Sequence, residues 1–342
     1  MDGEGICAGE YMVETKGITD GMSNNILILS CGTRDLLVRY FKRADYERVI
    51  GADCSELAPA LYEADKYYLI PRMKEEGYFD AILEICRKEG ITAILPLQED
   101  ELNLISENRE LFEQEGIRTI VSPVETLQIC RDKYCFFEHM TEHGIPVLNS
   151  YIDLAKFEKA YEAGKIGFPV FVKPVRGAGS VGVMKVSCME LLKALFAYSE
   201  EPLLIQEFCN GKEFGIDVYV DLVSGEVVDI FAKEKLRMRA GETEKSVTSN
   251  DPALKEFVYR AASTLKLSGP VDMDVFEKDG IFYLSEINPR FGGGFPHAYA
   301  CGVDTPSYIL QNLQGIANES HLQEKREEIY VLKYSDILCI DR

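Results

Sequence analysis

The sequence predicts an α/β fold in its first third and an α+β fold in the remainder: a doubly wound parallel sheet followed by a larger domain built from antiparallel hairpins. Between residues 25 and 122, short apolar runs alternate with amphipathic helical runs, as in a parallel sheet covered by helices. After Ser122-Pro123, runs typical of hairpins replace this alternation. The length of 342 residues is sufficient for two or three domains.

The first region contains four expected strands and three expected helices. We expect strands at 25–30, 48–53, 91–97 and 117–122, and helices from the CGTRD turn to Phe41, over 76–90 and over 101–116. Two of these helices are followed by Gly90 and Gly116, a common helix end. The turn Ser30 to Arg34 lacks the GxGxxG pattern of dinucleotide sites. We therefore expect this domain to be a scaffold that faces the substrate.

The second region begins with a helix that carries residues 131–133 and a linker that leads to a strand ending at Lys173. Further elements are a helix at 189–201, a strand at 203–208, and two hairpins, one with its turn at 224–225 and one over 271–290. The expected domain bounds are 1–22 for a poorly ordered leader, 23–122 for the parallel-sheet domain, 123–320 for the second domain with a lid at about 150–208, and 321–342 for a C-terminal segment.

Composition excludes several classes of protein. The net charge of −20 argues against nucleic acid or an anionic membrane as the main partner. No apolar run approaches the roughly 18–20 residues of a membrane span, and no signal peptide opens the chain. Ten cysteines without a CxxC pair and four dispersed histidines argue against a zinc site. We expect reduced thiols in a cytoplasmic protein; a site for a polyanion must concentrate cations locally.

Four oxygen-bearing side chains cluster on the hairpin 271–290. Asp272 and Asp274 alternate along one strand and share a face, as do Glu286 and Asn288 on the returning strand. Strand pairing can therefore bring Asp274, Glu286 and Asn288 together, with Asp272 nearby. Such hard oxygen donors suit Mg²⁺ that is held partly by substrate phosphates.

The residues after this cluster help to interpret it. Arg290 follows directly, and 292–294 are three consecutive glycines. Arginine binds phosphate through its planar fork, and glycine-rich backbone lets N–H groups approach an anion. We favour a phosphate–metal site, with a solvated acidic surface as the alternative.

Lys173 lies before a glycine-rich loop, FVKPVRGAGSVGV, whereas the lysine of a P-loop comes after its glycines. On a strand, Lys173 would act as a point charge on a phosphate or near the adenine. The loop could fold over a triphosphate as a lid, with backbone N–H donors. Glycine turns between strands are common, but a second lysine upstream, Lys133, supports the nucleotide interpretation. The loop residues concerned are Gly177, Gly179, Ser180 and Gly182.

The segment LLIQEFCNGKEFG offers contacts for a nucleoside. Glu207 ends a strand, and Phe208-Cys209 would form a hinge whose backbone offers one donor and one acceptor to an adenine edge. Glu207 and Glu213 could accept hydrogen bonds from the adenine amino group or the ribose hydroxyls. Ordinary carboxylates at a strand end are the alternative.

A basic run supplies the local positive charge that the acidic chain requires. Lys233, Lys235, Arg237 and Arg239 lie within seven residues. Alternation along a strand would place all four cations on one side. A solvated basic face is the alternative.

The order of these motifs resembles the ATP-grasp superfamily, most closely single modules of the carbamoyl-phosphate synthase large subunit and its carboxylate–amine ligase relatives. The resemblance runs from about residue 133 to 294, and the preceding βαβ region is similar to the family's preceding domain. It implies a pre-ATP-grasp domain followed by a two-lobed ATP-grasp domain. The motifs are Lys133, Lys173-Pro174, GxGSxGV, QEF…GKE, the basic run and DMD…SEINPR.

The resemblance also implies roles for individual residues. Lys133 and Lys173 would contact the nucleotide phosphates and adenine, under the glycine-rich loop as a mobile lid. Arg290 would hold the transferred phosphoryl group. The other implied roles are adenine contacts for Glu207, Phe208 and Cys209, a ribose contact for Glu213, a nucleotide contact for Lys233, Mg²⁺ ligation by Asp274, Glu286 and Asn288, and catalysis by Arg290, Lys173 and Arg237.

Members of this family activate a carboxylate as an acyl phosphate, which an amine then attacks. The resemblance thus implies ATP and two Mg²⁺, or alternatively Mn²⁺, as cofactors, and a small carboxylate and an amine as substrates. Whether the protein forms a homodimer is left open. A kinase-like phosphotransferase and a non-catalytic ATP-binding regulator are the alternatives. The chain differs from carbamoyl-phosphate synthase in two respects. It shows one module where that enzyme has two, which argues against carbamoyl phosphate synthesis. It also has Asp274 where many relatives have Gln. Candidate substrate contacts are Gln98–Glu101, Arg237, Arg239 and the loop 292–299 with His297.

Overall fold

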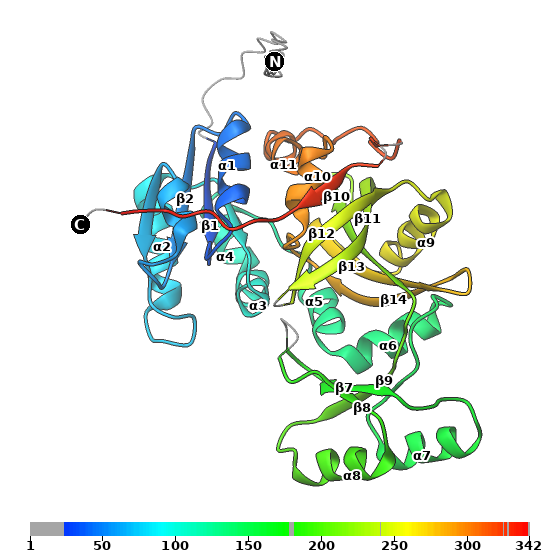
Figure 1. Ribbon diagram of the computed structural model, residues 1–342. Coiled ribbons are helices and arrows are strands. Elements are labelled where there is room, and N and C mark those ends of the chain that lie inside the picture. Colours follow the sequence, from blue (N-terminus) through cyan, green and yellow to red (C-terminus); the bar gives the residue numbers. More distant parts are fainter. Residues whose placement is uncertain (1–23, 178–180, 240, 324, 327, 341–342) are drawn as a thin grey trace, which may run out of the picture.

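The computed structural model describes residues 24–177, 181–239, 241–323, 325–326 and 328–340, and these residues form three sheets (Figure 1). The expected leader at 1–22 lies outside the described residues. Among the helices described, none is long and apolar enough to cross a membrane. The α/β and α+β fold class predicted from the sequence is confirmed.

The N-terminal domain is a five-stranded parallel sheet with strand order β3-β2-β1-β4-β5. Its central strands β1 and β4 are entirely buried, as expected when helices cover both faces. The chain reverses its direction of travel across the sheet between β1 and β4, where open α/β sheets bind ligands at the strands' carboxyl ends. The elements are β1 (Asn25–Leu29), α1 (Asp35–Arg43), β2 (Arg48–Asp53), β3 (Lys66–Leu69), α2 (Tyr78–Glu89), β4 (Ala93–Pro96), α3 (Glu99–Glu107), α4 (Arg109–Gln114) and β5 (Arg118–Thr119).

Two details of this domain differ from the sequence prediction. The helix expected over 101–116 is two helices, because Asn108 both ends α3 and precedes α4, and its side chain donates to the carbonyl of Leu104 at 2.8 Å. Strand β3 was not predicted. It is an edge strand whose residues are mostly exposed, although its sequence, KYYL, is largely apolar and aromatic.

The second domain is built on a six-stranded antiparallel sheet with the order β14-β13-β10-β11-β12-β15. Along β10 and β13, alternate residues such as Ile216 and Met273 pack into one core with α9, while Asp217, Asp272 and Asp274 face the opposite side. This alternation places the charged face of the sheet. The elements are β10 (Lys212–Val220), β11 (Val227–Arg239), β12 (Glu242–Ser249), α9 (Pro252–Ala262), β13 (Gly269–Lys278), β14 (Ile281–Asn288), α10 (Phe295–Ala300), α11 (Thr305–Leu313) and β15 (Tyr330–Leu332).

A shared apolar core joins the two domains. Phe41 of α1 packs against Phe291, with ring centroids 6.0 Å apart, and Tyr40 stacks on Tyr299 at 3.7 Å. Side chains of β1, α10 and α11 belong to the same core. The turn after β1 therefore has a fixed position relative to the charged face of the six-stranded sheet.

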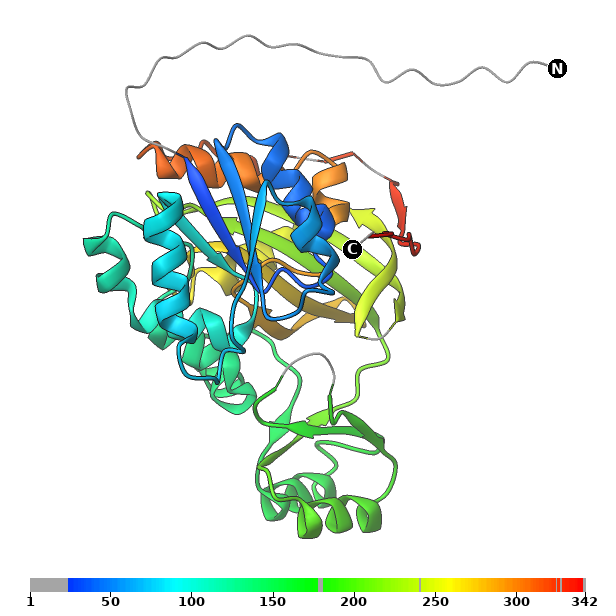
Figure 2. The ribbon, with the colours of Figure 1, turned by 90° about the vertical axis from the view of Figure 1, so that its left-hand side faces the viewer.

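A third lobe protrudes from the rest of the molecule (Figure 2). It has a small antiparallel sheet, β6-β9-β7-β8, and its own core around Phe157. The sequence predicted one helix through residues 131–133, but Asp132 lies between two helices, because its carboxylate caps α6 by accepting from the backbone N–H groups of Tyr134 and Cys135. The elements of this lobe are β6 (Ser150–Tyr151), α7 (Leu154–Glu162), β7 (Val170–Pro174), β8 (Met184–Val186), α8 (Met189–Tyr198) and β9 (Leu203–Glu207). The preceding helices α5 (Val124–Arg131) and α6 (Lys133–Glu142) lead into the lobe but pack against the cores of the two larger domains.

Candidate active site

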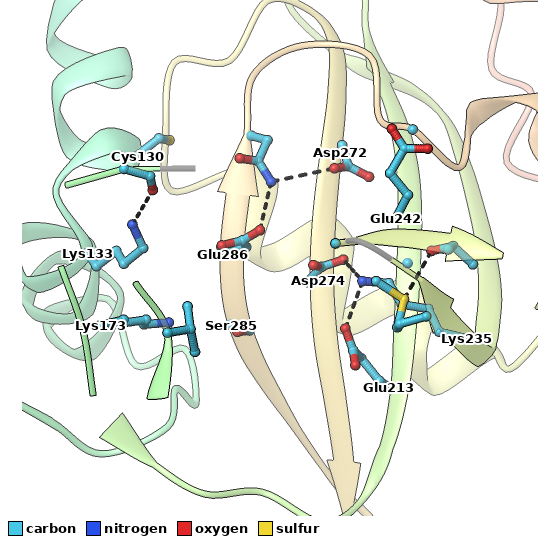
Figure 3. Close-up of a pocket in the computed structure, with 18 of the residues that line it drawn as sticks. Cys130, Lys133, Lys173, Glu213, Lys235, Glu242, Asp272, Asp274, Ser285 and Glu286 are labelled. Atoms are coloured by element: carbon cyan, nitrogen blue, oxygen red, sulfur yellow. Dashed lines mark hydrogen bonds and ion pairs between the residues drawn. The ribbon is translucent and has the colours of Figure 1, made fainter. Parts of the chain in front are cut away.

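A cleft of about 420 Å³ lies where the three lobes meet (Figure 3). Most of the predicted site residues line it, although they come from seven different segments. Gly182, Phe208 and Arg237 are described but do not line the cleft, and Gly179 and Ser180 lie outside the described residues. The predicted residues in the lining are Lys133, Lys173, Gly177, Glu207, Cys209, Glu213, Lys233, Asp274, Glu286, Asn288 and Arg290.

The pairing of β13 with β14 brings the predicted metal ligands together. Asp272 lies opposite Asn288, and Asp274 lies opposite Glu286. The amide nitrogen of Asn288 lies 3.1 Å from Oε1 of Glu286 and 3.5 Å from Oδ2 of Asp272. Arg290 Nη1 donates to the same Asp272 oxygen at 3.1 Å. The hairpin thus presents three carboxylates, one amide and one guanidinium to the cleft.

Lys235 neutralises part of this negative charge. Its Nζ lies 2.5 Å from Oδ1 of Asp274 and 2.8 Å from Oε1 of Glu213. Burial raises the pKa of Asp274 to about 7; the neighbouring carboxylates of Asp272 and Glu286 add to this rise, and Lys235 opposes it. Burial alone would lower the pKa of Lys235, but the two carboxylates raise it. Lys235 therefore stays charged and joins the carboxylates of Glu213 and Asp274.

These oxygens suit Mg²⁺. Among the described residues, no three His, Cys, Asp or Glu side chains are grouped closely enough to hold a metal alone. Mg²⁺ does not require such a group, because one or two carboxylates together with phosphate oxygens suffice. Asp274 and Glu286 supply two carboxylates, and rotation of the Asn288 amide would present an oxygen in the place of its nitrogen.

Lys233 is buried at the floor of the cleft, with 1% of its side chain exposed, and it forms an ion pair with Asp217. Glycines make room for it. A Cβ at position 294 would lie 2.5 Å from Lys233 Cε, and a Cβ at Gly215 would lie 3.4 Å from the same atom. The sequence identified the lysine but gave no signal for its buried carboxylate partner.

Two lysines lie at the entrance from the protruding lobe. Lys173 Nζ donates to Oε1 of Gln206 at 2.8 Å, and Lys133 Nζ donates to the carbonyl of Gly177 at 2.6 Å. Burial lowers the pKa of Lys173 to about 8, against the opposing effect of Glu286. Lys133 contacts the start of the glycine-rich loop, so the two elements that were predicted independently meet in the structure.

The expected adenine hinge follows β9. The Glu207 carboxylate accepts from Asn149 Nδ2 at 2.7 Å, and Cys209 is buried in the cleft lining. The ring of Phe208 packs against Phe171, with centroids 5.4 Å apart, and lies beneath Lys185. Phe208 therefore supports the cleft wall through its side chain, and the predicted backbone contact to adenine stays a prediction.

The prediction that four cations share one face is wrong beyond Lys235. The register of β11 against β12 shifts between Lys235 and Arg237 and again after Arg237. A bulge turns the following side chains to the other face. Arg237 and Arg239 are consequently 62% and 72% exposed and pair with Glu244, while Met238 lines the cleft.

His297 is a structural residue in this fold. It is 1% exposed and lies between the hydroxyls of Ser246 and Thr248, at 2.7 and 3.1 Å. Burial lowers its pKa to about 4. Of the segment 98–101, Glu99 lines the cleft, whereas Glu101 is buried behind it.

The sequence did not single out several residues that line the cleft or contact its lining. Arg34, from the turn after β1, and Glu242, at the start of β12, line the end of the cleft near Arg290. Glu242 Oε2 pairs with Lys333 at 3.0 Å, and Lys333 Nζ also donates to the carbonyl of Gly293 at 2.7 Å. Only the position of Arg34 in a turn at the carboxyl end of a parallel strand could have indicated it.

Comparisons with known families match both regions of the chain. The family described as PylC-like, N-terminal domain matches residues 26–120, and the family described as ATP-grasp in the biosynthetic pathway with Ter operon matches residues 199–337. The first match covers the parallel-sheet domain. The second covers the hairpins that carry the acidic cluster.

Individual proteins agree with these matches. The chain is 27% identical to the carbamoyl phosphate synthase arginine-specific large chain of Bacillus subtilis over 53% of this chain and 18% of that relative. It is 28% identical to the D-alanine–D-alanine ligase of Geobacillus thermodenitrificans over 54% of this chain and 58% of that relative. The chain thus spans less than two thirds of either relative.

A solved structure shows the same fold. The biotin carboxylase domain of the Hydrogenobacter thermophilus 2-oxoglutarate carboxylase, in complex with MgADP, ADP and bicarbonate, superposes with a TM-score of 0.72 at 21% identity, covering 91% of this chain and 74% of that one. Residues 199–337 match an ATP-grasp family, and the shared fold and the order of the motifs around the cleft make the chain similar to ATP-grasp proteins.

Proposed function

We propose that this protein is an ATP-dependent ligase that activates a small carboxylate as an acyl phosphate and joins it to an amine. One observation carries the proposal: a single cleft combines lysines for a polyphosphate, an oxygen cluster for Mg²⁺ and an arginine beside that cluster. The relatives named as ligases support it, as does a solved neighbour that binds MgADP.

In the proposed complex, the nucleotide lies between the protruding lobe and the six-stranded sheet. Glu207, Cys209 and Glu213 face its nucleoside, and Lys133 and Lys173 face its phosphates. Asp274, Glu286 and Asn288 would hold Mg²⁺, or Mn²⁺ as the alternative ion. When bound, the metal supplies positive charge to the phosphate oxygens during transfer.

Two displacements complete the proposed reaction. An oxygen of the substrate carboxylate attacks the γ-phosphorus of ATP, the bond from that phosphorus to the β,γ-bridging oxygen breaks, and ADP leaves. The amine nitrogen then attacks the acyl carbon, the bond from carbon to the phosphate oxygen breaks, and inorganic phosphate leaves as the nitrogen loses a proton. No protein nucleophile is needed, because positioning and charge neutralisation suffice. Arg290 lies where it can hold the transferred group.

The test is a matrix of small carboxylates and amines, assayed for ADP release and analysed by mass spectrometry. We expect one carboxylate–amine pair to give a product lighter by one water than the two substrates together. Glu286→Gln should reduce turnover by more than 100-fold without loss of the fold. Arg237→Gln is the matched control, because the exposed Arg237 lies outside the cleft lining.

Other products would reject the proposal. A stable phosphorylated product that no amine displaces would identify a phosphotransferase. Nucleotide binding without turnover of any pair would favour a regulator.

The reaction is proposed for the cytoplasm, which supplies ATP and keeps thiols reduced. The nine free cysteines among the described residues are consistent with such a compartment.

A further inference from the structure

We infer that Arg34, contributed by the N-terminal domain, binds the substrate carboxylate, and that Glu242 binds an ammonium group of the same small molecule. The inference deepens the proposed function and rests on it. It makes Arg34 a specificity-determining residue for a zwitterionic substrate such as an α-amino acid.

Arg34 is a cation without an anionic partner in the described part of the chain. No hydrogen bond or ion pair to its guanidinium is found there, although it lines the cleft. The adjacent charges are otherwise matched, because Arg290 pairs with Asp272 and Lys333 pairs with Glu242. Burial, and after it the positive charge of Arg290, lower the pKa of Arg34, while the nearby carboxylates of Glu242 and Asp272 oppose this without pairing with it directly. A bound anion in direct contact would offset the lowering.

Helix stability does not explain Arg34. It occupies the residue before α1, where its side chain makes no capping hydrogen bond. A positive charge at a helix N-terminus opposes the helix dipole. The side chain of Arg34 therefore does not serve to stabilise the start of α1.

The turn that carries Arg34 is held rigidly from two sides. Asp53 Oδ2 accepts from the backbone N–H of Gly32 at 2.8 Å, and Glu101 Oε1 accepts from Ser30 Oγ at 2.5 Å. Ser30 has a φ of 47°, a conformation that a non-glycine residue adopts rarely and that these contacts hold. Such fixed geometry is typical of a binding residue that is organised before its ligand arrives.

Glu242 lies beside Arg34 across Gly293. A Cβ at Gly293 would lie 3.5 Å from Arg34 Nη1 and 3.3 Å from Glu242 Oε1. The other oxygen of Glu242 accepts from Lys333, so Oε1 is the atom that faces this space. A guanidinium and a carboxylate oxygen around one glycine complement a carboxylate and an ammonium group separated by one carbon atom.

The zwitterion would lie next to the phosphoryl-transfer centre. Arg290 is close enough to Arg34 to affect its pKa, and Arg290 contacts the acidic cluster through Asp272. A carboxylate held by Arg34 would therefore face the group that Arg290 holds. The two arginines come from different domains, and the shared core around Phe41 and Phe291 fixes their separation.

The experiment measures binding separately from turnover. Thermal shifts are recorded with saturating MgADP and each of twenty α-amino acids, together with their carboxamide and N-acetyl forms. Wild-type protein should be stabilised by at least one amino acid and by neither blocked form. Arg34→Gln should weaken this binding by at least 30-fold and leave the affinity for MgADP within twofold. Arg39→Gln, on the exposed face of the adjacent helix α1, is the matched control and should bind as wild type does.

Each result supports or overturns the inference. Wild-type affinity in Arg34→Gln, or equal binding of the carboxamide, would overturn the role of Arg34; equal binding of the N-acetyl form would overturn that of Glu242. Binding of no panel member by the wild type overturns the assigned ligand class. If the amino acid binds through Arg34 but no amine yields a product, the ligase proposal fails while the subsite stands. If products form but the KM of Arg34→Gln for the carboxylate is unchanged, the subsite fails alone.

Discussion

Two lysines in the cleft carry a positive charge in surroundings that are largely removed from water. Lys233 is buried and Lys173 is half-buried, but of these two cations only Lys233 has a carboxylate partner in the described structure; Lys173 contacts the neutral amide of Gln206. Burial disfavours a charged lysine unless an anion compensates. The first lysine is thus left for a ligand, and the second is part of the fold.

Nucleotide affinity should depend on the protonation of Lys173. Its pKa of about 8 implies that about nine-tenths of the protein has lost this charge at pH 9. We expect the Kd for MgATP to rise up to about tenfold between pH 7 and 9. The effect on stability has the opposite sign: the unfolded state binds the proton more tightly, so the contribution of this residue to stability increases from pH 8 to about 10.5.

The control for this prediction is Lys173→Arg, because arginine stays protonated throughout this range. Calorimetric titration at several pH values should give a flat profile for the variant, whatever its absolute affinity. Equal slopes for the two proteins would show that another group titrates.

The pair of Lys233 with Asp217 should contribute to folding. Removing one partner of a buried ion pair leaves an uncompensated charge, which costs about 3–5 kcal/mol. We expect Lys233→Met to lower the free energy of unfolding by about this amount in urea titrations. The double variant with Asp217→Asn should regain most of the loss, and a double variant no more stable than the single one would contradict this account.

At the scale of elements, two local irregularities shape the cleft. The bulge in β11 ends the row of inward cations after Lys235. The three glycines after β14 each leave space beside a charged side chain: Gly292 beside Asp272, Gly293 beside Glu242 and Arg34, and Gly294 beside Lys233. Both segments are visible in the sequence. Only the strand pairing and packing in the structure showed which charged side chains lie next to them.

The glycine run gives two contrasting predictions. Gly293→Ala should fold normally and raise the KM for the carboxylate substrate at least tenfold, because its methyl group would enter the space between Arg34 and Glu242. Gly294→Ala would contact Lys233 at 2.5 Å and should destabilise the protein by about 1–3 kcal/mol. Steady-state kinetics and urea unfolding of both variants separate the effects; a common defect in stability would contradict the distinction.

At the scale of the whole molecule, the N-terminal domain and the six-stranded sheet share a core, whereas the protruding lobe has its own. We expect Phe291→Ala to cost about 3–5 kcal/mol and to reduce hydrogen-exchange protection in β1 and β11 together. Phe157→Ala in the protruding lobe is the matched comparison, and its loss of protection should concentrate in β7 and β9. Independent unfolding of β1 and β11 in the first variant would contradict a shared core.

The sequence by itself determined the alternation of strands and helices, the cross-strand pairing of Asp274 with Glu286 and the order of the nucleotide motifs. These features depend on local periodicity, which neighbouring residues specify. Only the tertiary structure decided that Arg34 lies near Arg290, that Lys233 pairs with Asp217 and that Arg237 lies outside the cleft lining. Those outcomes depend on how separate segments pack and on a shift of strand register, which residues distant in the chain determine together.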